Sequence, residues 1–152
     1  MPYPDIFSKE VTEKLIERIQ NLNSSSQPQW GKMNVAQMLA HCSVTYQYIY
    51  EDTFKQPNFF MKFILKSFVK NIVVGEKPYP KNSRTAPDFL ITDERNFNVE
   101  KSRLIDFLKT TQSLGAAHFD GRESHSFGKL SKNEWNSMFY KHLDHHFVQF
   151  GV

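Results

Sequence analysis

The sequence predicts an all-α fold: a four-helix bundle with one long crossover connection and one inserted helix. Three observations favour this class. Apolar residues recur at helical spacing in four long segments, two segments begin with a capping-box pattern, and no convincing hairpin signal interrupts them. The chain has 152 residues, a length typical of one domain, so we expect residues 1–152 to form a single domain.

The first two helices follow from their caps and their apolar spacing. One is predicted from Ser8 to about Leu22, with Ser8 as its N-cap, and the turn-forming stretch "NSSSQPQWG" ends it. The next begins at Asn34, with Gln37 three residues later in a capping box, and continues through "VAQMLAHCSVTYQYIY". Pro57 lies just beyond its end.

The inserted helix is predicted over residues 58–74, "NFFMKFILKSFVKNIVV", where Lys62, Lys66 and Lys70 stack on one side. We interpret it as a largely buried helix that shows one solvated lysine ridge. A homodimer face is the next alternative. A basic amphipathic helix lying on a membrane is the last, so we expect no membrane partner.

The second half of the chain predicts a long irregular connection and two more helices. Three prolines argue against any long helix in "GEKPYPKNSRTAPDFLITDERNF". A helix is predicted from Asn98 to about Leu114, with Gly115 as its stop, and a loop from there to Ser131. There "SKNE" forms a second capping box, which opens a last helix that runs to about Phe150.

Composition excludes several classes of function. The net charge of +3 is too small to indicate a nucleic-acid-binding surface, so no nucleic-acid partner is expected. Cys42 is the only cysteine, which rules out an intrachain disulfide, and its place on an apolar stripe indicates a buried, inert thiol. The first ten residues lack the pattern of a secretory signal, and no stretch is apolar enough to span a bilayer. We therefore expect a cytoplasmic protein.

Three of the six histidines lie close together in the last predicted helix, within "YKHLDHHFVQF". At about 100° per residue, His142 and His146 fall inside the apolar stripe of that helix, and His145 falls at its edge. Lys141 falls on the opposite side. Two inward histidines four residues apart can clamp a metal ion, although buried histidines that only make hydrogen bonds are a common alternative.

His41, on the second helix, is the candidate for a third ligand. Its direction lies about 110° from the centre of the apolar stripe, on a flank that it shares with Gln37, Thr45 and Tyr48. It can therefore face either a neighbouring helix or solvent, and periodicity alone does not decide. We expect the other prominent residues to lie outside the metal site. Trp30 and Trp135 are expected to anchor the core, His118 to face solvent, and His125 not to be a ligand.

Two stretches resemble a known superfamily. "WGKMNVAQMLAHCSVTYQ" at residues 30–47 resembles the start of the second helix in the DinB-like (YfiT-like) superfamily of metalloenzymes. "HSFGKLSKNEWNSMFYKHLDHHFVQFG" at residues 125–151 is similar to the closing segment of an uncharacterised branch, and the likeness extends loosely to "KNSRTAPDFL". The resemblance implies a four-helix bundle with a three-histidine metal site, formed here by His41, His142 and His146. His145 is a substitute or a supporting residue.

The function expected from these residues is that of a divalent-metal-dependent enzyme. Three imidazoles leave a coordination position open and suit Zn²⁺, Ni²⁺ or Fe²⁺. The resemblance implies a thiol-dependent S-transferase or isomerase, acting on a small molecule with a low-molecular-weight thiol, whereas metal-assisted hydrolysis is an alternative. A non-catalytic bundle that binds a metal or small ligand, and a helical interaction module, remain open. No general base stands out, Gln37 and Tyr48 are candidate pocket liners, and a homodimer is expected.

Overall fold

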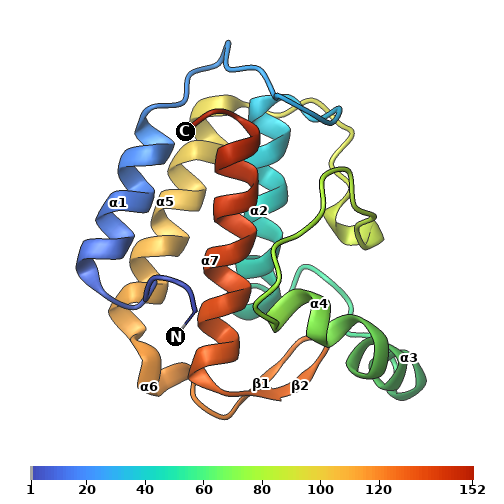
Figure 1. The fold of residues 1–152 in the computed structure, drawn as a ribbon. Coiled ribbons are helices and arrows are strands. Elements are labelled where there is room, and N and C mark those ends of the chain that lie inside the picture. Colours follow the sequence, from blue (N-terminus) through green and yellow to red (C-terminus); the bar gives the residue numbers. More distant parts are fainter. Residues whose placement is uncertain (1) are drawn as a thin grey trace.

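The computed structural model describes residues 2–152 and is mostly helical, with helices over 58% of the chain and one small two-stranded sheet. Four long helices run side by side (Figure 1). They are α1 (Lys9–Gln20), α2 (Val35–Tyr50), α5 (Phe97–Leu114) and α7 (Lys132–Gln149). The all-α prediction is thus confirmed at the level of a mostly helical protein.

The ends of these helices lie within two residues of the predicted positions, because the predicted caps form. The Ser8 hydroxyl accepts a hydrogen bond from the Val11 N–H at the start of α1. Both predicted capping boxes are present, Asn34 with Gln37 on α2 and Ser131 with Glu134 on α7. Such caps satisfy backbone N–H groups that have no partner inside the helix.

The core lies between the four long helices. Its largest fully buried side chains are mostly aromatic and branched aliphatic: Trp135, Tyr46, Phe119, Phe139, Phe147, Ile6, Leu15, Ile19, Met38, Leu39, Leu104 and Leu108. Helix α2 is the most enclosed of the four, since every residue from Val35 to Gln47 except Gln37 is buried. A side chain that points in almost any direction from α2 therefore meets protein.

Residues 59–74 are helical as predicted, but they are not largely buried. The segment is continuous: α3 (Phe59–Ile64), a π-helical turn (Leu65–Val69) and α4 (Lys70–Val74). It projects from the long helices (Figure 1). Phe59 is 89% exposed and Phe68 is 73% exposed, and only Val74 is buried. The prediction of a largely buried helix is wrong, because only one face of the segment packs against the rest of the protein.

The helical wheel was also wrong about Lys141, which it placed opposite the apolar stripe of α7. Lys141 is buried, and its ammonium group donates hydrogen bonds to the backbone carbonyls of Ile72, Gly75 and Lys77. The C-terminal end of α4 covers this side of α7, so α7 has no solvated face there.

The predicted loop between residues 116 and 130 contains structure that the sequence did not predict. A short helix α6 (Ala116–Phe119) is followed by the antiparallel pair β1 (Arg122–Ser124) and β2 (Gly128–Leu130). The connection over residues 75–96 is irregular, as predicted, apart from a 3₁₀ turn at Pro87–Phe89. Among the described residues, no helix is both long enough and apolar enough to cross a membrane.

Candidate metal centre

The three histidines predicted as ligands come together between α2 and α7. His41 lies on α2, and His142 and His146 lie one turn apart on α7. One nitrogen atom from each ring can be chosen so that all three lie within 4.8 Å of one another. The ring centroids of His41 lie 4.9 Å from His142 and 4.5 Å from His146. The structure therefore has a three-histidine group that could hold a metal ion.

Each ring is oriented by a partner on its Nδ1 atom. The Nδ1 of His41 lies 2.8 Å from the carbonyl oxygen of Phe89, to which its N–H donates. The Nδ1 of His146 lies 2.7 Å from Oε1 of Gln149, and that of His142 lies 3.3 Å from the hydroxyl of Thr45. These contacts leave the Nε2 atoms available, in the way that metal-ligating histidines are commonly held by a second partner.

The partner of His146 is itself held in place. Nε2 of Gln149 donates a hydrogen bond to the carbonyl oxygen of Trp30, 2.7 Å away. Gly31 follows with φ of +83°, and a Cβ atom at this position would come within 2.7 Å of the same amide nitrogen. A glycine here permits both the backbone conformation and the close approach of Gln149.

Burial keeps the three rings neutral. Desolvation lowers the pKa of His41 and of His142, and it lowers the pKa of His146 to about 3. The charges that neighbouring histidines would carry lower the pKa of each ring further. Neutral imidazole is the form that binds a metal ion, so the rings are in the binding form at neutral pH.

The distance between two of the rings fits both a metal centre and a hydrogen bond. Nε2 of His41 and Nε2 of His142 are 3.0 Å apart. Two nitrogen ligands on a tetrahedral zinc ion lie about 3.3 Å apart, given Zn–N distances of about 2.05 Å. Without a metal, His142 can donate its Nε2 proton to His41, while its Nδ1 accepts from Thr45. Binding of a metal through Nε2 requires the proton of His142 to lie on Nδ1 instead. The hydroxyl oxygen of Thr45 can accept a hydrogen bond from that N–H.

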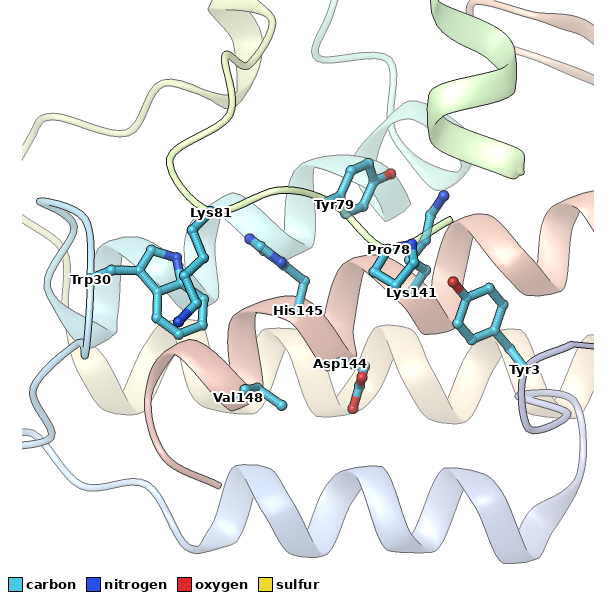
Figure 2. A pocket seen from close by; sticks show the side chains of 9 residues that line it. All are labelled: Tyr3, Trp30, Pro78, Tyr79, Lys81, Lys141, Asp144, His145 and Val148. Carbon is cyan, nitrogen blue, oxygen red and sulfur yellow. The ribbon is translucent and has the colours of Figure 1, made fainter. Parts of the chain in front are cut away.

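His145 lies outside the group of three. Figure 2 shows it projecting from α7 between Trp30 and Tyr79, and both aromatic rings meet it edge-on with centroids 5.7 Å away. Together these residues line a small cavity of about 230 Å³. Trp30 is only half-buried, with Lys81 above its ring, so its predicted place in the core is wrong, whereas Trp135 is buried as predicted.

The three histidines line a much larger open chamber of about 1160 Å³. Gln37 and Tyr48 line it as well, in agreement with their predicted position beside His41. His125 stacks on Tyr48 with ring centroids 3.8 Å apart and does not belong to the three-histidine group.

Two further expectations about single residues are confirmed. The thiol of Cys42 is buried, and this burial raises its pKa, so it remains protonated and is not a nucleophile. His118 is exposed to solvent, as expected.

Sequence reasoning missed the three atoms that orient the rings. A backbone carbonyl such as that of Phe89 cannot be identified from the residue type. The position of Thr45 on the same flank as His41 indicates closeness to that ring but not its contact with His142. Gln149 lies three residues after His146, a spacing that places both on one face of a helix, and this spacing could have identified it.

The comparisons with known proteins identify a family. No curated protein and no solved structure matches the chain significantly. The model of a family described as "Protein of unknown function (DUF1569)" matches residues 8–151, which include all three histidines and their orienting partners. The chain therefore belongs to the DUF1569 family.

Proposed function

We propose that this protein is a divalent-metal-dependent enzyme whose ion is held by His41, His142 and His146. The observation that carries the proposal is the arrangement of the rings. Each has its Nδ1 engaged, the Nε2 atoms of His41 and His142 lie 3.0 Å apart, and all three rings line one large chamber. Zinc, nickel and iron all suit imidazole ligands, so the metal is proposed only as one of these.

The donor set indicates a catalytic centre rather than a structural one. Structural zinc sites use four protein ligands, whereas catalytic sites use three and leave a position open. Among the described residues, the group of potential ligands contains three histidines and no carboxylate or thiolate. An ion bound by neutral ligands alone keeps its full charge, acts as a Lewis acid and lowers the pKa of a bound water or thiol.

The chain contributes orientation and a shaped chamber to this chemistry. Phe89, Thr45 and Gln149 fix the directions of the three rings. The chamber provides room for a small-molecule substrate and a thiol beside the open position. We propose S-transfer or isomerisation with a low-molecular-weight thiol, following the DinB-like resemblance, and a four-helix bundle formed by the four long helices.

Two alternatives keep the same site. Metal-dependent hydrolysis needs only a bound water instead of the thiol. A non-catalytic metal- or ligand-binding protein is favoured by the hydrogen bond that His41 and His142 can form without a metal, because the rings are then satisfied in both states.

The first experiment is elemental analysis of the untagged protein, before and after incubation with Zn²⁺, Ni²⁺ or Fe²⁺ at neutral pH. We expect about one transition metal per chain. His142→Ala should abolish loading because it removes a ligand, and the matched control His145→Ala should retain it. A metal-free wild-type protein, or full loading of His142→Ala, would disprove the proposed site.

Turnover then separates an enzyme from a binding protein. The metal-loaded protein is incubated with low-molecular-weight thiols and electrophilic or isomerisable substrates, and separately with esters in the absence of thiol. Thiol-dependent turnover that is lost in His142→Ala supports the transferase or isomerase. Turnover of esters without thiol supports the hydrolase.

A further inference from the structure

The chamber next to the histidines has an apolar half and a polar half. Along α7 its lining extends from Trp135 to Gln149, about 21 Å at 1.5 Å per residue. His142 and His146 lie toward the C-terminal end of that span. Figure 1 shows that α2 runs in the opposite direction to α7, so the start of α2 lies level with the end of α7. From the bounds of the helices, Gln37 belongs to the end of the chamber that holds Gln149, and Tyr48 to the end that holds Trp135.

The half that extends from the histidines toward the start of α7 is lined mainly by apolar side chains. Its depth is about 10 Å, because Trp135 lies seven residues before His142 on the helix. The projecting segment packs beside this half, since Lys70 on α4 forms a salt bridge of 3.0 Å with Glu134 at the start of α7. The projecting segment, Phe127 and α7 contribute apolar side chains here: Met61, Leu65, Val69, Phe127, Trp135 and Met138. The stacked rings of Tyr48 and His125 line the chamber at this end as well.

The other half, beyond the histidines, is polar and basic. Lys32, Gln37, Arg84 and Gln149 line it. Histidines aside, the charged residues that line the whole chamber are three basic ones, Lys32, Lys55 and Arg84, and one acidic one, Asp88. The Asp88 carboxylate already accepts a hydrogen bond from the Tyr48 hydroxyl at 2.8 Å. Histidines aside, the formal charge of the side chains that line the chamber is therefore positive.

We infer that the chamber binds an amphipathic anion: a molecule with an apolar body and one anionic group that lies at the histidines. The apolar body occupies the half lined by Leu65 and Val69, where burial of each methylene favours binding. A carboxylate, thiolate or similar anion suits a divalent ion that neutral rings leave uncompensated. This inference deepens the proposed function and rests on it for the anchoring of the anion at the metal.

The test uses straight-chain hydroxamic acids, which bind zinc through their head group. Affinities of acetohydroxamate and octanohydroxamate for the zinc-loaded protein are measured by calorimetry. Each methylene that is fully buried in the apolar half should tighten binding about fourfold. The eight-carbon compound has six more methylenes than the two-carbon compound, so burial of about half of them should already make it bind about a hundredfold more tightly. Equal affinities would overturn the inference.

Two variants on one segment locate the apolar body. Leu65→Gln should weaken octanohydroxamate about tenfold and leave acetohydroxamate unchanged, because Leu65 lines the chamber. Phe68→Gln is the matched control, since Phe68 is 73% exposed and does not line it. Equal effects of the two substitutions would contradict the placement. If Leu65→Gln does not fold, the chain-length series on the unaltered protein still decides.

The charge requirement is tested separately. Octanoate should displace octanohydroxamate, and octylamine, of the same length and opposite charge, should not. Displacement by both would show that only the apolar body is recognised. If the protein holds no zinc, the proposed function fails, and the inference is then judged by direct binding to metal-free protein. The inference is upheld only if octanoate binds the metal-free protein more tightly than both butyrate and octylamine.

Discussion

Each histidine of the candidate metal centre takes its orientation from a different kind of partner: a backbone carbonyl, a hydroxyl and a side-chain amide. The amide of Gln149 has the most exacting position. Its nitrogen donates to the carbonyl of Trp30, and it lies so close to Gly31 that a side chain at position 31 would collide with it. A change at Gln149 should therefore alter His146 without removing any ligand.

We predict that Gln149→Leu weakens zinc binding by about tenfold to a hundredfold, the usual cost of losing a partner that orients a ligand. Leucine has a similar size but cannot accept the hydrogen bond from His146. The measurement is competition for zinc with a chromophoric chelator. Gln47→Leu is the control, because Gln47 is also buried but its side chain donates to Glu51, the residue that caps the same helix, and not to a histidine. Unchanged affinity in the Gln149 variant would mean that Gln149 does not orient a metal ligand.

At this scale the sequence predicted the pair on α7 better than the residue on α2. His142 and His146 follow an apolar stripe, and that stripe does face the interior. His41 lies off the stripe of α2, yet it is buried, because α2 is enclosed on nearly every side. A stripe is informative only for a helix with one solvated face. For His41 the resemblance to a known family supplied what periodicity could not.

At the scale of elements, the projecting segment is joined to α7 through one buried charge. The three carbonyls that Lys141 contacts lie in the last turn of α4 and just beyond it, where the free carbonyl groups of a helix carry partial negative charge. Burial lowers the pKa of Lys141 to about 8, so the ammonium group remains protonated at neutral pH. The segment that lines the apolar half of the chamber thus depends on the residue next to His142.

Lys141→Met should loosen this segment while α7 stays folded. Hydrogen bonds to a charged group contribute about 1.5–3 kcal/mol each, and methionine preserves the packing of the side chain. We expect a loss of at least about 2 kcal/mol in unfolding free energy and faster hydrogen exchange at residues 70–79. Lys132→Met, at an exposed position, is the control. Faster exchange throughout the protein would contradict a local role.

The outer face of the same segment gives an independent prediction. Phe60 is 69% exposed and Phe63 is 62% exposed. Replacing both with serine should change the free energy of unfolding by no more than about 0.5 kcal/mol per site, as for other exposed positions. In contrast, Phe139→Ser, at a residue that is 1% exposed, should cost about 3 kcal/mol or more. A large loss in the double variant, dependent on protein concentration, would show that another copy covers this face, as the expected homodimer requires.

At the scale of the whole molecule, the helical class and the order of the long helices could be predicted because caps and apolar spacing are local signals. The hairpin could not be. Its strands have three residues each, "RES" and "GKL", and neither shows the alternation typical of a strand. The exposure of residues 59–72 was not predictable either, since an apolar composition does not reveal whether a partner surface exists. The burial of Lys141 was not predictable for the same reason, since it results from the packing of α4 against α7.

The stability of the metal-free protein should fall as the pH falls from about 6.5 toward 3. The pKa of His146 is near 3 in the folded protein, compared with about 6.5 unfolded, so between these values only the unfolded chain takes up the proton. Each such histidine contributes a slope of up to about 1.4 kcal/mol per pH unit. Urea unfolding with a chelator present, at several pH values between 7.5 and 4.5, should show this loss. His146→Gln should have a shallower slope, and a flat profile for the wild type would contradict the buried, neutral rings.

The histidines of the candidate metal centre are separated by a large part of the chain, since His41 and His142 are 101 positions apart. During translation the first imidazole emerges long before the other two exist. The centre cannot assemble before α7 has been synthesised and has packed against α2. The proposed ion would therefore find its three ligands together only after these two distant segments have joined.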